Sequence, residues 1–98
     1  MLFFVMYDIS NDKVRNQLAK YLLGKGCYRV QKSVFLSDAS TDTYSLICRE
    51  LEQIQQFCED IVQILIVPIN RKSISELKVY GQSLDLGLIM KTQSTLFF

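Results

Sequence analysis

The sequence predicts a small α+β domain in which two helices pack on one sheet. Three apolar segments, at residues 2–7, 28–37 and 61–69, are rich in the β-branched and aromatic residues typical of strands. Two intervening segments repeat apolar residues at helical spacing. The chain has 98 residues, of which 49% are hydrophobic, so it is long enough for one domain with a core.

The first strand is expected at Leu2–Tyr7, where the residues are apolar on both sides, as in a central strand. Residues 10–12, Ser-Asn-Asp, carry side-chain oxygens that can cap a following helix. That helix should present an apolar face formed by Val14, Leu18, Ala19, Tyr21, Leu22 and Leu23. Gly24 and Gly26 predict where it ends.

The segment from residue 28 to residue 37 has strand composition, but no glycine or proline marks a turn in it. Its alternation places Tyr28, Val30, Val34 and Leu36 on one side, and Arg29, Gln31, Ser33 and Phe35 on the other. The apolar character breaks at residues 31–33. Periodicity alone predicts one strand, whereas a tight turn at the break would make a hairpin.

A second helix should follow the cap-forming segment 37–43, with Tyr44, Ile47, Cys48, Leu51, Ile54 and Cys58 on its apolar face. The strand at 61–69 ends near Pro68. Residues 70–78 read as a polar connection, and Lys78–Gln82 as a short edge strand. A last apolar run lies within residues 84–91.

If the break at residues 31–33 is a hairpin turn, this order of elements predicts a single ferredoxin-like βαββαβ domain. Both helices would then cover the same face of the sheet and leave the opposite face bare. A two-fold homodimer that packs sheet against sheet would cover it.

The net charge of +1 conceals an uneven distribution. Residues 13–32 contain six basic side chains and no acid, at Lys13, Arg15, Lys20, Lys25, Arg29 and Lys32. Residues 38–60 contain six acids and only one basic side chain, Arg49. The basic segment indicates either a surface for a polyanion or an ordinary solvated helix face.

The three cysteines, at positions 27, 48 and 58, form no Cys-x-x-Cys motif. We expect reduced thiols, with Cys48 and Cys58 buried as small apolar residues. The longest apolar runs are too short for a membrane span, and no signal peptide is recognisable. These features predict a soluble cytoplasmic protein.

Asp8 is the best candidate for chemistry, because it is the only charged side chain in the first eleven residues and ends an apolar strand. The chain has no histidine, which excludes histidine-based catalysis and argues against zinc as the bound metal. Mg²⁺, or Mn²⁺ in its place, takes oxygen ligands and often only one or two protein carboxylates. Two copies of Asp8 across a dimer axis would supply them. Alternatively, Asp8 caps the first helix or pairs with a lysine.

Other side chains near this strand end could bind a phosphate or form an interface. Arg15 and Arg29 can clamp phosphate oxygens, or can be ordinary surface charges. Ser10 can position a phosphate, although helix capping also explains it. Phe35 suits a dimer interface or a nucleic-acid surface, with the interface preferred.

Two segments resemble a known family. Val5-Met6-Tyr7-Asp8-Ile9-Ser10 with the basic helix after it, and Arg29-Val30-Gln31-Lys32-Ser33-Val34-Phe35, are similar to the signature of the CRISPR-associated endoribonuclease family. These are small CRISPR adaptation proteins that partner the spacer integrase. The resemblance covers about the first seventy residues, and Lys78–Gly81 resembles the family's late strand. The chain departs from the family at Leu36, where an acid is common.

The resemblance implies a homodimer in which residues 79–98 form a strand and tail that pack on the other protomer. It implies that Asp8 is the catalytic and metal-binding residue, with Tyr7, Ser10, Ser33 and Phe35 near the site or the dimer interface. It also implies Mg²⁺-dependent cleavage of single-stranded RNA or double-stranded DNA. The basic side chains that would contact nucleic acid are Lys13, Arg15, Lys20, Arg29 and Lys32.

Two functions stay open at this point. One is an adaptor that binds the backbone of double-stranded DNA and bridges integrase dimers during spacer acquisition. The other is a metal-dependent endonuclease, whose activity the first role would not require. A messenger-RNA-cleaving toxin of the same fold is a third alternative.

Overall fold

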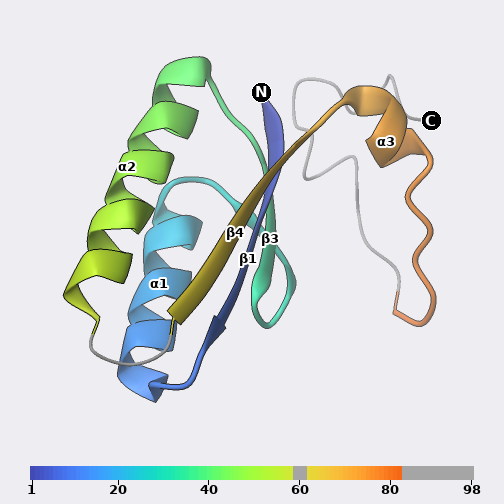
Figure 1. Ribbon diagram of the computed structural model, residues 1–98. Coiled ribbons are helices and arrows are strands. Elements are labelled where there is room, and N and C mark those ends of the chain that lie inside the picture. The colour runs from blue at the N-terminus through green and yellow to red at the C-terminus, as the bar shows by residue number, and fades with distance from the viewer. Residues whose placement is uncertain (59–61, 83–98) are drawn as a thin grey trace.

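A computed structural model describes residues 1–58 and 62–82 of the chain (Figure 1). Its elements are β1 (Leu2–Ile9), α1 (Asp12–Gly24), β2 (Tyr28–Gln31), β3 (Val34–Asp38), α2 (Thr41–Phe57), β4 (Val62–Ile69) and α3 (Arg71–Ser75). The strands form one sheet in the order β2-β3-β1-β4, and every neighbouring pair is antiparallel. This is the predicted ferredoxin-like arrangement, with β1 as a central strand.

The break at residues 31–33 is a hairpin turn. Lys32 and Ser33 form the turn between β2 and β3, and the register shifts between Arg29 and Gln31. The register pairs Arg29 with Phe35, which confirms that these two residues lie on the same side of the sheet. The single long strand that periodicity alone predicts is therefore wrong.

The main core lies between the sheet and the two long helices, which cover the same face (Figure 1). The side chains that bury most completely in it are Phe3, Val5, Leu18, Leu22, Phe35 and Ile47. In β1 the odd-numbered residues face this core, because side chains alternate along a strand. Leu23 was expected on the apolar face of α1, but it is 50% exposed and lies outside the core.

Side-chain caps begin both long helices. The Asn11 side chain accepts a hydrogen bond from the Val14 backbone N–H at 3.0 Å, and the Ser40 hydroxyl accepts one from Thr43 N–H at 3.1 Å. The cap of α1 is thus Asn11 and not Ser10. The helix ends at Gly24 as predicted, and Gly26 adopts a φ of 86°, which favours glycine.

A smaller cluster lies on the other face of the sheet, where Ile74 of α3 packs against Leu2 and Leu36. The polar connection expected at residues 70–78 therefore contains a short helix. The strand expected at Lys78–Gln82 is not formed, because these residues have no ladder partner within the described chain. The apolar run at residues 84–91 lies outside the described residues.

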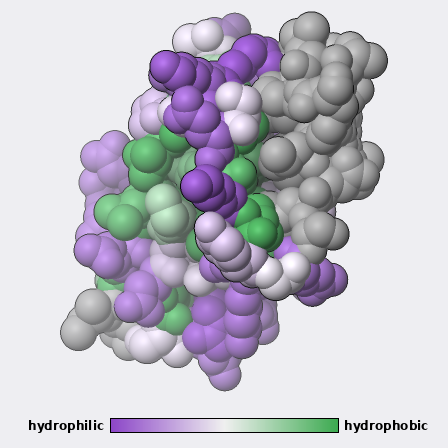
Figure 2. Space-filling view, turned by 90° about the vertical axis from the view of Figure 1, so that its right-hand side faces the viewer, coloured by the Kyte–Doolittle hydropathy of each residue, from purple (hydrophilic) through white to green (hydrophobic). Residues whose placement is uncertain are grey.

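The remainder of that face is apolar and accessible. We call it the open face and define it by Phe4 and Met6 of β1, Val34 of β3, and Leu65 and Val67 of β4. Leu65 is 48% exposed and Val67 is 37% exposed. Figure 2 looks onto this side of the molecule and shows apolar side chains gathered between polar ones.

The cysteines differ from expectation. Cys27 is buried in the core, and burial raises the pKa of its thiol, an effect partly offset by a hydrogen bond with Ser37. Cys48 and Cys58 are only partly buried, so the prediction that they are core residues is wrong. All three are free thiols. None of the helices in the described parts of the chain is long and apolar enough to cross a membrane.

Candidate functional site

Asp8 is exposed near the end of β1, on the same side of the sheet as Phe4 and Met6 of the open face. Within residues 1–58 and 62–82, its carboxylate has no hydrogen bond and no ion pair. Asn11 caps the helix instead. The two structural explanations for Asp8, a helix cap and a lysine pair, are therefore wrong.

Asp8 lines a hollow of about 200 Å³ at one end of the molecule. The end of β1, the first turns of α1 and the turn between β2 and β3 meet there (Figure 1). The hollow is lined by Tyr7, Asp8, Ile9, Arg15, Lys32 and Ser33. The fold thus brings together five residues that the sequence singles out. Ser10 is exposed beside the hollow and does not line it.

The turn that presents Lys32 and Ser33 is held by hydrogen bonds to one backbone oxygen. The Lys32 carbonyl accepts from Arg29 Nη2 at 2.7 Å, from Arg29 Nε at 3.2 Å and from the Tyr7 hydroxyl at 3.4 Å. Burial raises the pKa of Tyr7, and the nearby charges of Arg29 and Arg15 oppose that rise. Tyr7 therefore stays protonated and can donate at neutral pH.

Beneath this turn, Arg29, Phe35 and Tyr7 form a stack. The Arg29 guanidinium carbon lies 5.5 Å from the centroid of the Phe35 ring, and the Phe35 and Tyr7 ring centroids are 6.1 Å apart at an interplanar angle of 22°. Phe35 is 0% exposed within the protomer. The interface role predicted for Phe35 is therefore wrong, since the ring is covered by its own core.

Arg15 has partners of its own, which limits its use as a phosphate clamp. Its Nη1 donates to the Ile9 carbonyl at 3.1 Å, and its Nη2 pairs with Asp12. These contacts fix the connection between β1 and α1. The Arg15 side chain is 28% exposed and lines the hollow, so it remains partly accessible there.

Three other cations are accessible and carry no ion pair in the described chain. Lys13 and Lys20 are exposed on α1, and Lys32 is exposed at the hairpin turn. Lys13 and Lys20 are seven residues apart, so they lie on the same side of the helix. Lys25 differs, because its Nζ atom forms an ion pair with Glu50 Oε1 of α2 at 3.9 Å. Three of the six basic side chains of residues 13–32 are thus available to an anion, as far as the described chain shows.

The donor set for a metal ion is incomplete in one protomer. The described residues contain no group of three acidic, cysteine or histidine side chains that could hold an ion. Asp8 offers two carboxylate oxygens that have no competing partner in residues 1–58 and 62–82, which suits Mg²⁺ as one ligand among waters. The residues present fit a metal site only if a second copy contributes another carboxylate.

Sequence reasoning misses Gln63, which is the direct partner of Asp8 across the β1–β4 ladder. One signal could have found it, because Gln63 is the only polar residue between positions 61 and 69. Pairing between strands 55 residues apart in sequence cannot be read from periodicity, so the juxtaposition appears only in the fold.

The sheet has the order β2-β3-β1-β4, two helices cover one of its faces, and an acid near the end of β1 has no ion pair in the part of the chain that the structure describes. These features define a ferredoxin-like protein with a candidate metal and phosphate site. The chain belongs to the Cas2 family, since the family model for CRISPR associated protein Cas2 matches residues 1–77. This membership confirms the family to which the sequence motifs pointed.

Individual relatives agree with this assignment. The chain is 31% identical over 83 residues to "CRISPR-associated endoribonuclease Cas2" of Aeropyrum pernix, covering 85% of this chain and 88% of that protein. It is 32% identical over 98 residues to the protein of the same name from Mycobacterium tuberculosis, covering 100% of this chain and 78% of that protein. A crystal structure of Streptococcus pyogenes Cas2 at pH 6.5 has a similar fold, with a TM-score of 0.69 at 24% identity, covering 83% of this chain and 100% of that one.

Proposed function

We propose that the protein is a homodimeric CRISPR adaptation protein that binds the backbone of double-stranded DNA and bridges integrase dimers. The observation that carries the proposal is a set of exposed cations on α1 and the hairpin turn that form no ion pair within residues 1–58 and 62–82, namely Lys13, Lys20 and Lys32. Bridging of the integrase is inferred from membership of the family, which also favours this role over a messenger-RNA-cleaving toxin.

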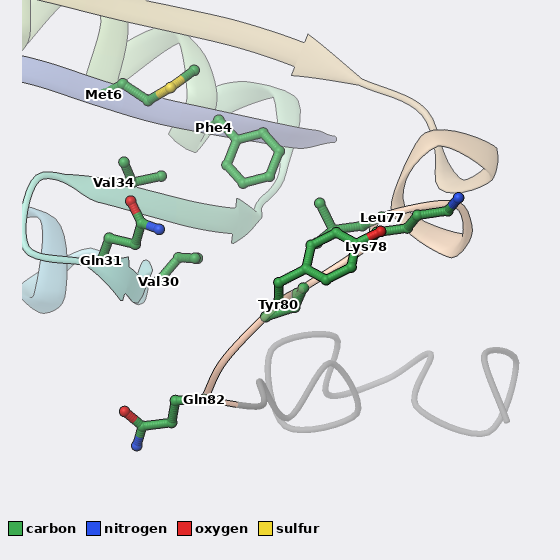
Figure 3. Close-up of a pocket in the computed structure, with 10 residues that line it drawn as sticks. Phe4, Met6, Val30, Gln31, Val34, Leu77, Lys78, Tyr80 and Gln82 are labelled. Carbon is green, nitrogen blue, oxygen red and sulfur yellow. The ribbon is translucent and has the colours of Figure 1, made fainter.

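The open face supports the dimer. Its exposed leucine and valine side chains would gain from burial, at about 25 cal/mol for each Å² of apolar area removed from water. The open face extends into a groove of about 540 Å³ (Figure 3). Strands β1, β2 and β3 line one side of this groove, and residues 77–82 line the other. A second copy packed on this face presents an identical apolar surface, as a two-fold interface requires. Each Asp8 would then lie near the joined surface.

Dimerisation would also double the cationic surface. DNA binding by such a surface releases counterions from the phosphate backbone, so affinity should fall steeply as salt increases. Lys13, Lys20 and Lys32 would contact phosphates, whereas Arg29 would mainly hold the turn through the Lys32 carbonyl. No base-specific readout is expected from this arrangement, because lysine contacts to phosphate carry no sequence information.

Reversing the charge of Lys13 and Lys20 together should weaken binding to double-stranded DNA. The slope of log affinity against log salt should become shallower by about 2, or about 1 for each lost phosphate contact. A matched control reverses Arg49 of α2 and Lys72 of α3, which gives the same net charge from exposed positions outside α1 and the hairpin turn. Fluorescence anisotropy across a salt series measures both slopes. Equal effects from the two double variants would show that only the total charge matters and would overturn the proposed interface.

The Asp8 carboxylate, which has no ion pair or hydrogen bond within the described chain, favours a second candidate function. This function is that of a metal-dependent phosphodiesterase acting on single-stranded RNA or double-stranded DNA. The relatives from Aeropyrum pernix and Mycobacterium tuberculosis carry the name endoribonuclease. In this proposal the Asp8 carboxylates of two protomers would hold Mg²⁺ or Mn²⁺, while Lys32 and the exposed part of the Arg15 side chain would bind the phosphate. A divalent cation supplies Lewis-acid stabilisation of a phosphate oxygen when it is bound. The Lys32 carbonyl contacts keep that turn beside Asp8.

A further inference from the structure

Gln63 and Asp8 face each other across two neighbouring strands. The antiparallel register pairs them directly, and both residues are exposed. Side chains directly opposite each other in such a ladder point to the same side of the sheet, with Cβ atoms about 4.5–5.5 Å apart. An amide and a carboxylate are therefore adjacent on the same side as the open face.

The pair is the polar end of two otherwise apolar rows. On β1 the row is Leu2, Phe4, Met6 and Asp8, and on β4 it is Ile69, Val67, Leu65 and Gln63. Packing against a second copy explains the apolar members of both rows. It does not explain the amide, because burying an amide without a partner is unfavourable. The Gln63 side chain makes no hydrogen bond within the described residues, so its polar atoms are available for a ligand.

The chemistry of the two side chains suits one type of ligand. Amide and carboxylate oxygens are both hard donors, and Mg²⁺ takes six oxygen ligands in octahedral geometry while keeping several waters. Two Asp8 and two Gln63 side chains across a two-fold axis would offer four oxygens. Two water molecules would complete the set. The amide would thereby supply the second protein oxygen from each protomer, which Asp8 alone does not provide.

We propose that the Gln63 side-chain oxygen is a second protein ligand for a divalent cation bound by Asp8. This inference rests on the proposed role of Asp8 at a dimer axis. In this proposal each protomer contributes one carboxylate, from Asp8 of β1, and one amide, from Gln63 of β4. A change of the amide should therefore alter cation affinity without altering the fold.

The test is isothermal titration of the full-length protein with Mn²⁺ and with Mg²⁺. Gln63→Leu should weaken binding on the order of tenfold or more, a loss of the size seen when a group that supports a metal site is removed. Gln63→Glu should tighten it, because a carboxylate replaces a neutral amide oxygen. The matched control is Gln56→Leu, an exposed glutamine of α2, which should leave affinity unchanged. Sedimentation and thermal unfolding check that each variant keeps its mass and fold.

The outcomes separate this inference from the proposed function. If Asp8→Asn abolishes binding while Gln63→Leu leaves it unchanged, the Asp8 site stands and the role of Gln63 is wrong. Weaker binding by Gln63→Glu would also overturn that role, since it would mean that the amide acts as a hydrogen-bond donor. If Asp8→Asn leaves affinity unchanged, the site proposed at Asp8 is itself wrong, and Gln63 is no ligand of it.

Discussion

Replacing Leu65 with arginine is expected to convert the protein from a dimer into a monomer. Leu65 lies on β4 within the open face and is 48% exposed, so the substitution should leave the protomer folded. In the proposed dimer it would place two unpaired guanidinium groups in an apolar interface, where the loss of hydration has no compensation. The molecular mass measured by sedimentation equilibrium should therefore fall from twice 11.4 kDa to 11.4 kDa.

Leu23→Arg is the matched control for this change. Leu23 is 50% exposed, nearly the same as Leu65, but it lies on α1, in the layer on the other side of the sheet. The control should keep the dimer mass. If Leu65→Arg also keeps it while circular dichroism shows a folded protein, the sheet-to-sheet dimer is contradicted.

Replacing Asp8 with asparagine should abolish metal-dependent cleavage and leave DNA binding intact. The substitution keeps the shape of the side chain but removes the charge that would hold the cation, and several kcal/mol of stabilisation are lost with it. Cleavage of single-stranded RNA and of double-stranded DNA should fall by a hundredfold or more, on the order expected for such a loss. The Asp8 carboxylate makes no hydrogen bond or ion pair within residues 1–58 and 62–82, so the fold and the dimer should be unaffected.

Glu52→Gln provides the comparison, because it removes an exposed acid of α2, which covers the face of the sheet opposite to Asp8. It should retain full cleavage. Cleavage by Asp8→Asn at the parental rate would mean that the activity comes from another site or from a contaminant. The first proposed function requires that DNA binding does not depend on the cleavage site. Loss of DNA affinity in Asp8→Asn would contradict that requirement.

The sequence predicted the elements of the fold more fully than their contacts. Strand parity placed Arg29 and Phe35 on one side, and the register confirms this. It could not say which side faces the helices, because both rows of the hairpin contain apolar residues. That choice buries Phe35, which is why the interface expected there was wrong.

The sequence also predicted only part of the candidate site, because it does not show which backbone atoms a side chain contacts. Asp8 stood out because a lone acid at the end of an apolar strand is unusual, and its carboxylate has no ion pair among the described residues. Arg15 and Arg29 were expected as phosphate clamps, but much of their hydrogen bonding goes to the Ile9 and Lys32 carbonyls. Backbone acceptors of this kind have no signature in sequence, because they depend on how the turn folds.

The proximity of two Asp8 residues is the central claim, and spin labels attached at this position test it directly. The label would be carried by Asp8→Cys in a chain with Cys48 and Cys58 replaced by serine, since Cys27 is buried. At dimer mass, the electron paramagnetic resonance spectrum should show strong dipolar broadening that disappears on mixing with excess unlabelled protein. A label at Asp42→Cys on α2 should show none. A dimer whose position-8 labels give no broadening would contradict the account.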